Sequence, residues 1–438
     1  MRIFYNALVL LGLPFVALYW GWRAITEATY RRNFLQRFGF RYPRVDRQRP
    51  VIWVHAVSVG EVQASAALVR ALQARMPDAQ MLITTVTPTG ADRVQLLFGD
   101  AVRCAYVPYD LMPTVRRFYR KIKPALAIIV ETELWPNLYH EAGVQNIPLV
   151  LASARISPRS MPRYRRLVGL FRDALSNGII IAAQSEIDRQ RFVELGAPPE
   201  RTFVSGNIKF DVNVDEDITR RGEAFRREFL GDRPVWIAAS THEGEEAIIV
   251  EAHQQLLQTI PDLLLVLVPR HPPRFAEVAQ LLERLGCNFV RRTDGQRCTE
   301  QTNILLGDTM GEVPMFYAGA DIAFVGGSLV RVGGHNLLEP AIAGVPILTG
   351  PYLFNAQDIA NMFLERDAAR VVSNAADLVT SLKALLADDQ ERAAMGQRAQ
   401  ALMDENRGAV NQLLQQLEPF IDGGRPIAGT NRPTADPG

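Results

Sequence analysis

From residue 50 onward, short apolar runs alternate with amphipathic segments of helical periodicity. The runs are apolar on both faces, which is typical of parallel strands buried between helices. Strands that alternate with helices predict βαβ units and a doubly wound sheet. The first series of predicted strands comprises Val51–Ala56, Met81–Thr87, Ala125–Val130, Pro148–Ala154 and Gly178–Gln184.

The alternation breaks at residues 211–232, a highly charged stretch that we interpret as a linker with an exposed helix. A second series of strands then begins: Val235–Ser240, Leu263–Val268, Asn288–Val290, Asn303–Leu306, Asp321–Val325 and Val345–Leu348. The fold class is therefore α/β, with two Rossmann-like parallel-sheet domains in tandem. Ligands of such sheets bind beyond the carboxyl ends of the strands, so we expect the two domains to face a common cleft.

The predicted domains are residues 23–210 and residues 233–421, the second of which would include C-terminal helices. Residues 422–438 are rich in Gly, Pro and polar side chains, a composition that predicts a disordered tail.

The N-terminus has a different pattern, because residues 3–22 carry no charge. Their number is about that needed to cross a bilayer as a helix, and Tyr19, Trp20 and Trp22 resemble interfacial aromatic residues. Several arginines follow between Arg23 and Arg49, which predicts a cytoplasmic flank. We expect residues 1–22 to anchor the protein to the cytoplasmic side of a membrane, either spanning it or lying on it; with the family resemblance described below, this would be the cell inner membrane. The alternative is a buried helix of the first domain.

The composition mainly excludes certain partners and sites. The 438 residues carry 48 Lys and Arg against 47 Asp and Glu, a net charge of +1, so nothing indicates a nucleic-acid partner. Cys104, Cys287 and Cys298 are far apart and odd in number, which argues against a disulfide framework or a structural zinc site. No acid or histidine spacing calls for a metal ion.

Two acidic residues follow strands of the first domain. Glu61 lies in the first turn of the helix after the first strand, where a carboxylate can accept a proton from an attacking hydroxyl. On spacing alone, a glutamate that only complements the helix dipole is the better interpretation. Glu131 follows the strand Ala125–Val130, and a buried acid there requires a partner. Arg155 and Lys209 are the candidates, although Lys209 could equally be a solvated lysine between the domains.

Residues 321–351 contain the strongest binding signal: a strand, a glycine-rich loop, a short helix and a second strand. Such a loop lets an anion approach the backbone, and a helix N-terminus attracts phosphate. Asn336 can cap the helix and Glu339 could contact ribose hydroxyls, or the two could form only a structural capping pair.

Other strand ends of the second domain are also polar or glycine-containing, notably Pro269-Arg270-His271 and Met310-Gly311-Glu312. Together they predict a nucleotide pocket. There is no Walker loop, no Gly-x-Gly-x-x-Gly after the first strand and no Gly-x-Ser-x-Gly elbow. Hydride transfer, nucleotide hydrolysis and serine hydrolase chemistry therefore lose support.

With these motifs in order, residues 1 to about 420 closely resemble the 3-deoxy-D-manno-octulosonic acid (Kdo) transferases of bacterial lipopolysaccharide synthesis. The resemblance rests on the apolar N-terminus and on six motifs: His55-Ala-x-Ser-x-Gly-Glu61, Glu131-Thr-Glu-x-Trp-Pro-Asn137, Gly206-Asn-x-Lys209, Pro269-Arg-His271, Asp308-Thr-Met-Gly-Glu312 and Gly333-Gly-His-Asn-x-x-Glu-Pro340.

The resemblance implies a GT-B fold and metal-independent, inverting transfer of Kdo from CMP-Kdo to a lipid A precursor, lipid IVA, without a cofactor. It implies that Glu61 is the general base and that Glu131 and Lys209 stabilise the transition state. The CMP-binding residues it implies are Pro269, Arg270, Met310, Gly311, Glu312, Asn336, Leu337, Leu338 and Glu339. The alternatives are a GT-B UDP-sugar transferase or epimerase, and a membrane-tethered protein that only binds nucleotide sugars or lipids.

Overall fold

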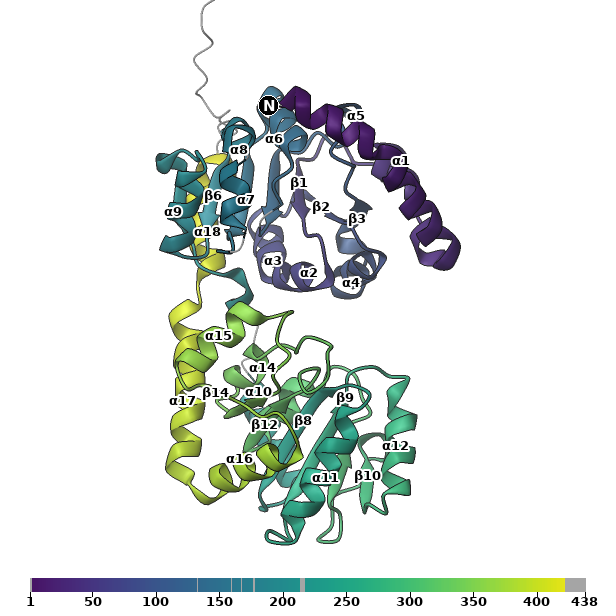
Figure 1. Cartoon of the computed structure of the whole chain (residues 1–438), viewed down its shortest axis with the longest axis vertical. Coiled ribbons are helices and arrows are strands. Elements are labelled where there is room, and N and C mark those ends of the chain that lie inside the picture. The colour runs from purple at the N-terminus through teal and green to yellow at the C-terminus, as the bar shows by residue number, and fades with distance from the viewer. Residues whose placement is uncertain are drawn as a thin grey trace, which may run out of the picture. The chain divides into compact units, whose positions relative to one another are not determined.

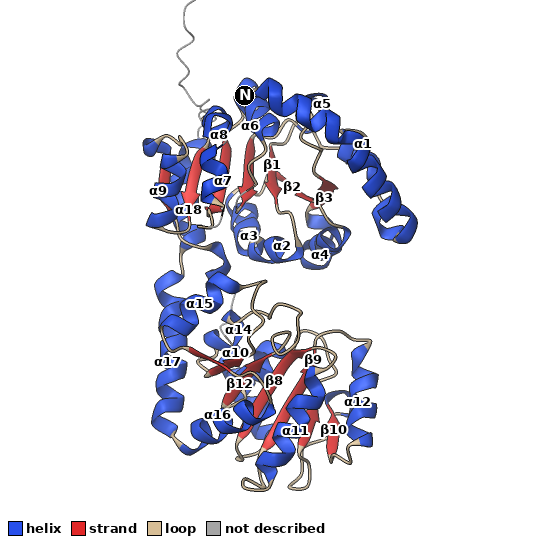
Figure 2. Ribbon diagram, in the orientation of Figure 1, coloured by secondary structure: helices blue, strands red, loops and turns tan. Residues whose placement is uncertain are grey.

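The computed structural model describes residues 2–131, 133–158, 160–166, 168–175, 178–212 and 217–421. The chain divides into two compact units, one formed by Met1–Val212 with Asn406–Gly438 and the other by Asn213–Glu405. Each contains a seven-stranded parallel sheet with helices on its faces (Figures 1 and 2). The predicted tail, 422–438, lies outside the described residues.

The sheet of the first unit reverses its strand order once. Its order is β3-β2-β1-β4-β5-β6-β7, with every pair parallel. The strands are β1 (Val51–His55), β2 (Gln80–Thr85), β3 (Arg103–Tyr106), β4 (Leu126–Val130), β5 (Leu149–Ala154), β6 (Ile180–Ala183) and β7 (Thr202–Val204). The chain moves outward from β1 to β3 and then returns to place β4 on the other side of β1. This reversal is the topological switch point at which open parallel sheets bind ligands.

Alternate residues of β1 enter different cores of the first unit. Trp53 packs with α5 (Met112–Ile122), α6 (Pro136–Val144), α8 (Val168–Leu175) and α9 (Glu186–Glu194). Ile52 and Val54 pack with α2 (Val59–Ala64), α3 (Ala66–Arg75) and α4 (Pro88–Phe98). The helices that follow β1 and β4 therefore cover opposite faces, so the loops after these two strands diverge.

The last helix, α18 (Ala409–Ile421), belongs to the first unit. Leu413 and Leu417 are buried in the same core as Ile52 and Val54. The Asp211 carboxylate accepts a hydrogen bond from the Gly408 N–H at 2.6 Å, at the start of this helix. Residues 406–421 thus lie with the first unit. The prediction from the sequence had placed the whole range 233–421 in the second domain.

The second unit repeats the plan. Its strands are β8 (Val235–Thr241), β9 (Leu264–Pro269), β10 (Phe289–Arg291), β11 (Ile304–Leu306), β12 (Ile322–Val325), β13 (Ile347–Thr349) and β14 (Ala369–Val371). All pairs are parallel in the order β10-β11-β9-β8-β12-β13-β14, so the reversal lies between β8 and β12. The helices are α10 (Ile218–Phe225), α11 (Glu245–Leu257), α12 (Arg274–Arg284), α13 (Val313–Ala318), α14 (Leu338–Ile342), α15 (Gln357–Glu365), α16 (Ala375–Ala387) and α17 (Asp389–Asn406).

Helix α10 falls in the range 211–232, which was predicted to be a linker with an exposed helix. Gly222 lies so close to α13 that an added Cβ would be 2.4 Å from the Ala318 Cβ. The Phe225 and Phe316 rings also pack with centroids 5.1 Å apart. The described part of the range from residue 218 is therefore packed structure of the second unit, and the high charge of its exposed face had obscured this.

Helix α1 (Arg2–Thr26) is fastened to the first unit near its N-terminus. The Tyr5 hydroxyl donates to Asp110 Oδ2 at 2.8 Å, and the Asn137 amide donates to Asn6 Oδ1 at 2.7 Å. A stripe of apolar side chains at heptad spacing is exposed instead: Leu8, Leu11, Phe15, Leu18, Trp22 and Ile25. Among the described residues, no helix has the length and apolar character that crossing a bilayer requires.

Candidate active site

Glu61 lies at the switch point of the first unit, in the first turn of α2. Ser58 caps this helix, with its hydroxyl accepting a hydrogen bond from the Glu61 N–H at 3.5 Å. The Glu61 carboxylate turns back toward the start of the helix, where Oε2 accepts the Val57 N–H at 2.7 Å and Oε1 accepts the Ser58 hydroxyl at 3.3 Å. This arrangement resembles a capping box, although Glu61 accepts the N–H of Val57, one residue before the cap, so Glu61 does have a structural role at the start of the helix.

The environment of Glu61 also suits a proton acceptor. Burial raises the pKa of its carboxyl to about 7, and the nearby Glu131 and Glu133 carboxylates act in the same direction. The hydrogen bonds from Val57 and Ser58 oppose this rise but are outweighed. A general base works best when its pKa lies near the working pH, which this balance provides. The capping role and a basic role are therefore compatible.

Glu131 follows β4, directly across the switch point from the loop after β1. Its φ of 60° is left-handed, which is uncommon for a residue other than glycine and is characteristic of functional strand ends. Lys209 Nζ lies 2.5 Å from Glu131 Oε1, and both side chains remain partly exposed. The contact is therefore an ion pair between opposite charges. Of the two partners expected for Glu131, the structure shows Lys209.

Ser153 connects β5 to the turn that carries Lys209. Its side chain is fully buried, and its φ of 55° is also left-handed, beside an irregularity in the β5–β6 pairing. The Ser153 hydroxyl donates to Asn207 Oδ1 at 3.3 Å and accepts the Ile208 N–H at 3.4 Å. Asn207 Oδ1 in turn accepts the Lys209 N–H at 3.0 Å. The backbone of Lys209 is thus held through Asn207 by a residue of the sheet.

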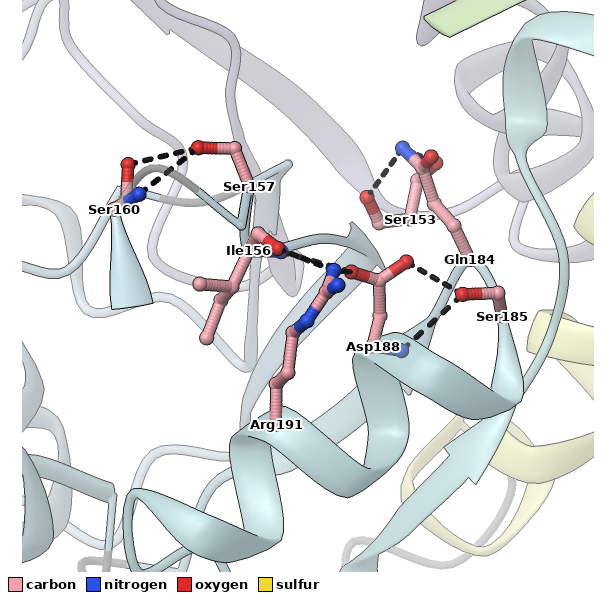
Figure 3. Close-up of polar contacts among 8 residues, drawn as sticks. All are labelled: Ser153, Ile156, Ser157, Ser160, Gln184, Ser185, Asp188 and Arg191. Atoms are coloured by element: carbon pink, nitrogen blue, oxygen red, sulfur yellow. Dashed lines mark hydrogen bonds and ion pairs between the residues drawn. The ribbon is translucent and has the colours of Figure 1, made fainter. Parts of the chain in front are cut away.

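Figure 3 shows how the ends of β5 and β6 are joined around Ser153. Gln184 donates its amide to the Ser153 carbonyl at 3.0 Å and to the hydroxyl at 3.2 Å. Beyond it, Asp188 accepts the Ile156 N–H at 3.0 Å, and Arg191 donates to the Ile156 carbonyl at 2.7 Å. The loop after β5 is therefore fixed to α9, which gives the Lys209 turn a rigid support.

In the second unit, the glycine-rich loop after β12 is already occupied by a carboxylate of the protein. Glu245, at the start of α11, is fully buried and accepts the N–H groups of Gly327, Ser328 and Leu329 at 2.7–2.9 Å. It also accepts the His242 N–H at 2.9 Å. These loop N–H groups are therefore not open to an anion. The phosphate was predicted at the start of the following helix, α14, which is a separate element.

Three histidines join the loops after β8, β9 and β12. His242 and His335 stack with ring centroids 5.0 Å apart and their Nε2 atoms 2.7 Å apart. His271 packs edge-on against His242 at 5.4 Å. Burial lowers the pKa of all three, that of His335 to about 4, and the Arg270 charge acts in the same direction. At neutral pH these rings are uncharged hydrogen-bonding groups beside the Arg270 cation.

The predicted nucleotide-binding residues after β9 and β11 lie at the same edge of the sheet. Pro269 ends β9 and Arg270 follows it. Met310 is 62% exposed, and Gly311 adopts a φ of 84° with open space where a Cβ would lie. Glu312 begins α13, and its carboxylate pairs with Arg292 at 3.0 Å. The loop after β11 therefore offers an open backbone surface at Gly311.

The predicted residues after β12 divide into two kinds. Asn336 is exposed and its Oδ1 accepts the Leu338 N–H at 3.1 Å, but the N-cap of α14 is Leu337, so Asn336 holds the turn before the helix. Glu339 lies in the first turn of α14 and is half-buried. The Leu337 and Leu338 side chains are buried in the unit, so only their backbone could face a ligand.

The residues that hold the loops after the strands in place were not predicted from the sequence. Ser153, Gln184 and Glu245 act through tertiary hydrogen bonds, and His335 was noted only as part of a motif. Glu245 had a usable signal, because an acid in a first helical turn beside a glycine-rich loop can bind the loop N–H groups. Among the described residues, no group of three or more His, Cys, Asp or Glu side chains is placed to hold a metal ion.

Comparison with known proteins follows the same division of the chain. Residues 32–212 match the family model described as 3-deoxy-D-manno-octulosonic-acid transferase (kdotransferase), and residues 305–417 match a glycosyl transferase-like model. The 3-deoxy-D-manno-octulosonic acid transferase of Haemophilus influenzae is 42% identical over 96% of this chain and 99% of its own length. The enzyme of the same name from Bordetella pertussis is 36% identical over 94% of this chain and 98% of its own length.

Among solved structures, UDP-GlcNAc 2-epimerase from Neisseria meningitidis bound to UDP-GlcNAc has a TM-score of 0.54 and 15% sequence identity. The match covers 84% of this chain and 100% of the epimerase chain, and it establishes a shared GT-B-like fold alone. The near-complete match to curated relatives establishes more. The chain belongs to the 3-deoxy-D-manno-octulosonic acid transferase family, the glycosyltransferases that add Kdo in lipopolysaccharide biosynthesis.

Proposed function

We propose that this protein transfers Kdo from CMP-Kdo to a lipid A precursor, lipid IVA, with inversion at the anomeric carbon and with Glu61 as the general base. The observation that carries the proposal is the position of Glu61. It lies at the switch point of the first unit, with a carboxyl whose pKa burial raises to about 7. A glutamate of this kind is deprotonated often enough at neutral pH and still basic enough to accept a proton.

In the proposed reaction, an acceptor hydroxyl oxygen attacks the anomeric carbon of Kdo. The bond from this carbon to the phosphate oxygen breaks, and CMP leaves with the electron pair. The hydroxyl proton passes to a carboxylate oxygen of Glu61. The Val57 and Ser58 hydrogen bonds fix the direction of this carboxylate before substrate arrives. Such preorganisation lowers the cost of reaching the transition state.

Lys209 supplies the positive charge of the first unit's site in this proposal. Its ammonium group is oriented by Glu131, and its backbone is oriented by Asn207 and Ser153. Because the ion pair is partly exposed, the lysine can exchange some of its contact with Glu131 for a developing negative charge on the substrate. Electrostatic stabilisation of this kind often contributes most to enzymatic rate acceleration.

The second unit binds the CMP part of the donor in this proposal, along the loops after β9, β11 and β12. The supporting features are the Arg270 cation, the open backbone at Gly311 and the exposed Asn336 side chain before α14. The phosphate is assigned to Arg270 and the neighbouring histidine pair, since the N–H groups of residues 327–329 already bind Glu245. The reaction is proposed to proceed without a cofactor or metal ion.

We also propose that α1 attaches the protein to the cytoplasmic side of the inner membrane. Leu11, Phe15 and Leu18 are more than 70% exposed on the face of α1 opposite Tyr5 and Asn6. An apolar stripe of this kind is suited to lie in the bilayer interface, where each buried large side chain contributes roughly 1.5–3 kcal/mol. The exposed arginines between Arg23 and Arg49, a set that excludes the buried Arg37, would add attraction to anionic lipids.

Replacing the proposed base tests the function. Glu61→Gln removes the proton acceptor while its amide oxygen can still accept the Val57 N–H, so we expect turnover of CMP-Kdo and lipid IVA to fall about 10²–10⁴-fold. CMP affinity, measured by calorimetry, should not change, and the exposed Glu186→Gln variant should behave as wild type. Near-normal turnover in Glu61→Gln would refute the assignment of the base. Absence of Kdo transfer by the wild-type protein would refute the function.

Ser153 should affect the rate through Lys209. Ser153→Gly keeps the left-handed backbone without strain but removes the hydroxyl that holds Asn207 and Ile208. Losing about 1.4 kcal/mol of hydrogen bonding corresponds to a roughly tenfold lower kcat, with KM for CMP-Kdo unchanged. Ser160→Gly, which removes a hydroxyl bonded within its own loop to Ser157, is the matched control. Steady-state kinetics showing the same kcat for both variants would contradict this positioning role.

Membrane attachment can be tested without disturbing the contacts that fasten α1. The triple variant Leu11→Ser, Phe15→Ser and Leu18→Ser retains Tyr5 and Asn6, and we expect its cosedimentation with phosphatidylethanolamine–phosphatidylglycerol vesicles to fall at least about tenfold because apolar burial is lost. Leu96→Ser, which changes a similarly exposed leucine on α4, should sediment as wild type. Equal sedimentation of the triple variant and wild type would overturn the proposal.

A further inference from the structure

A cavity of about 360 Å³ lies between α1 and the body of the first unit. Tyr5 and Val9 of α1 form one side of it, and Tyr109 and Leu111, which precede α5, line it as well. Leu134 and Trp135, from the loop between β4 and α6, complete the lining. A cavity of only about 150 Å³ lined by apolar side chains can stay dry and bind an apolar ligand, so this one offers room for a larger apolar group.

The single carboxylate in the lining does not make the cavity polar. Asp110 accepts hydrogen bonds from the Tyr5 hydroxyl at 2.8 Å and from the N–H groups of Asn137 and Leu138 at 3.0 and 2.8 Å. Burial raises the pKa of Asp110 to about 6. Its hydrogen-bonding capacity is used in fastening α1, which leaves the apolar side chains to determine what the cavity accepts.

Trp135 connects this cavity to the candidate active site. Its indole N–H donates to Glu133 Oε2 at 2.7 Å, and its ring lies 5.6 Å from that of His55, the last residue of β1. Glu133 is one of the acids whose charge raises the pKa of Glu61. The same side chain thus contacts the acidic site and lines the apolar cavity. A ligand that occupies both must have a polar part joined to an apolar chain.

The two faces of α1 have different roles in this arrangement. The stripe containing Leu11, Phe15 and Leu18 is exposed, whereas Tyr5 and Val9 lie on the opposite face and line the cavity. An acyl chain of a lipid whose head group is at Glu61 could therefore leave the bilayer interface beside α1 and enter the cavity. A soluble sugar acceptor would leave this apolar surface uncovered.

We propose that the cavity between α1 and the β4–α6 loop binds an acyl chain of the lipid acceptor, so that α1 helps to select an acylated substrate. This inference rests on the proposed function, because it assigns the polar part of the same acceptor to Glu61. Val9 and Leu134 are then specificity-determining residues, and Trp135 links occupation of the cavity to the acidic site.

The kinetic test compares lipid IVA with its fully deacylated disaccharide in detergent solution. Wild type should use the acylated acceptor at least about tenfold better in kcat/KM. Val9→Trp fills the cavity, so KM for lipid IVA should rise about tenfold while kinetics with the deacylated acceptor stay unchanged. Val144→Trp makes the same change at an exposed position of α6 and should match wild type. An unchanged preference in Val9→Trp, or equal losses with both acceptors, would overturn the proposal.

A binding measurement keeps the proposal testable if the Val9→Trp variant folds poorly or if the wild-type protein shows no Kdo transfer. In a Trp20→Phe, Trp22→Phe background, which removes the tryptophans of α1, a lipid IVA analogue with one dibrominated acyl chain should quench Trp135 fluorescence saturably, and this quenching should be absent when Trp135→Phe is added. Quenching by dibrominated phosphatidylglycerol at equal strength would show that the cavity takes bilayer lipid, and no saturable quenching would show that it takes no acyl chain. Either result overturns the proposal. If quenching occurs but neither acceptor receives Kdo, the proposed function fails and the acyl site stands.

Discussion

The single reversal of strand order in each parallel sheet is the constraint on which the rest of the structure depends. In the first unit, β1 and β4 are neighbours, but the helices that follow them cover opposite faces of the sheet. The loops after these strands must diverge, and the strand ends between them cannot be covered by either helix. Glu61 and Glu131 lie at this place, which is why two acids from distant parts of the sequence influence one another.

Charge balance at the switch point explains how acids so close together are tolerated. Glu131 pairs with Lys209, while Glu61 is kept in a buried position that favours its protonated form. The cost of burying Glu61 is partly offset by the capping hydrogen bonds to Val57 and Ser58. The second unit has the same reversal of strand order, between β8 and β12. There the Glu245 carboxylate binds the N–H groups of the glycine-rich loop and fixes that loop from inside the unit.

The sequence was a good guide where the signal is local. Fully apolar runs such as Leu126–Val130 and Val235–Ala239 lie buried in strands, and both predicted parallel sheets are present. Lys209 was one of two partners expected for Glu131. Short strands at the sheet edges were missed, because β3 begins with the exposed Arg103 and β14 has two exposed residues of three. Their pairing, and not their composition, makes them strands.

Features that depend on distant contacts could not be predicted. The return of α18 to the first unit depends on Asp211 and on a core built from other helices. The left-handed backbone of Ser153 follows from an irregular sheet register, and serine has no local signal for it. The fastening of α1 through Tyr5 and Asp110 likewise joins residues more than 100 positions apart.

The most direct test of this account is an NMR titration of the Glu61 side-chain carboxyl carbon in the full-length protein, with the signal assigned from Glu61→Gln. Because burial and the neighbouring acids disfavour the charged form, the account predicts a midpoint near 7, with the carboxylate gaining its charge, and its capacity to accept a proton, as the pH rises through that value. A midpoint near 4.5, the ordinary value for glutamate, would show that Glu61 is a solvated capping residue and would contradict the account.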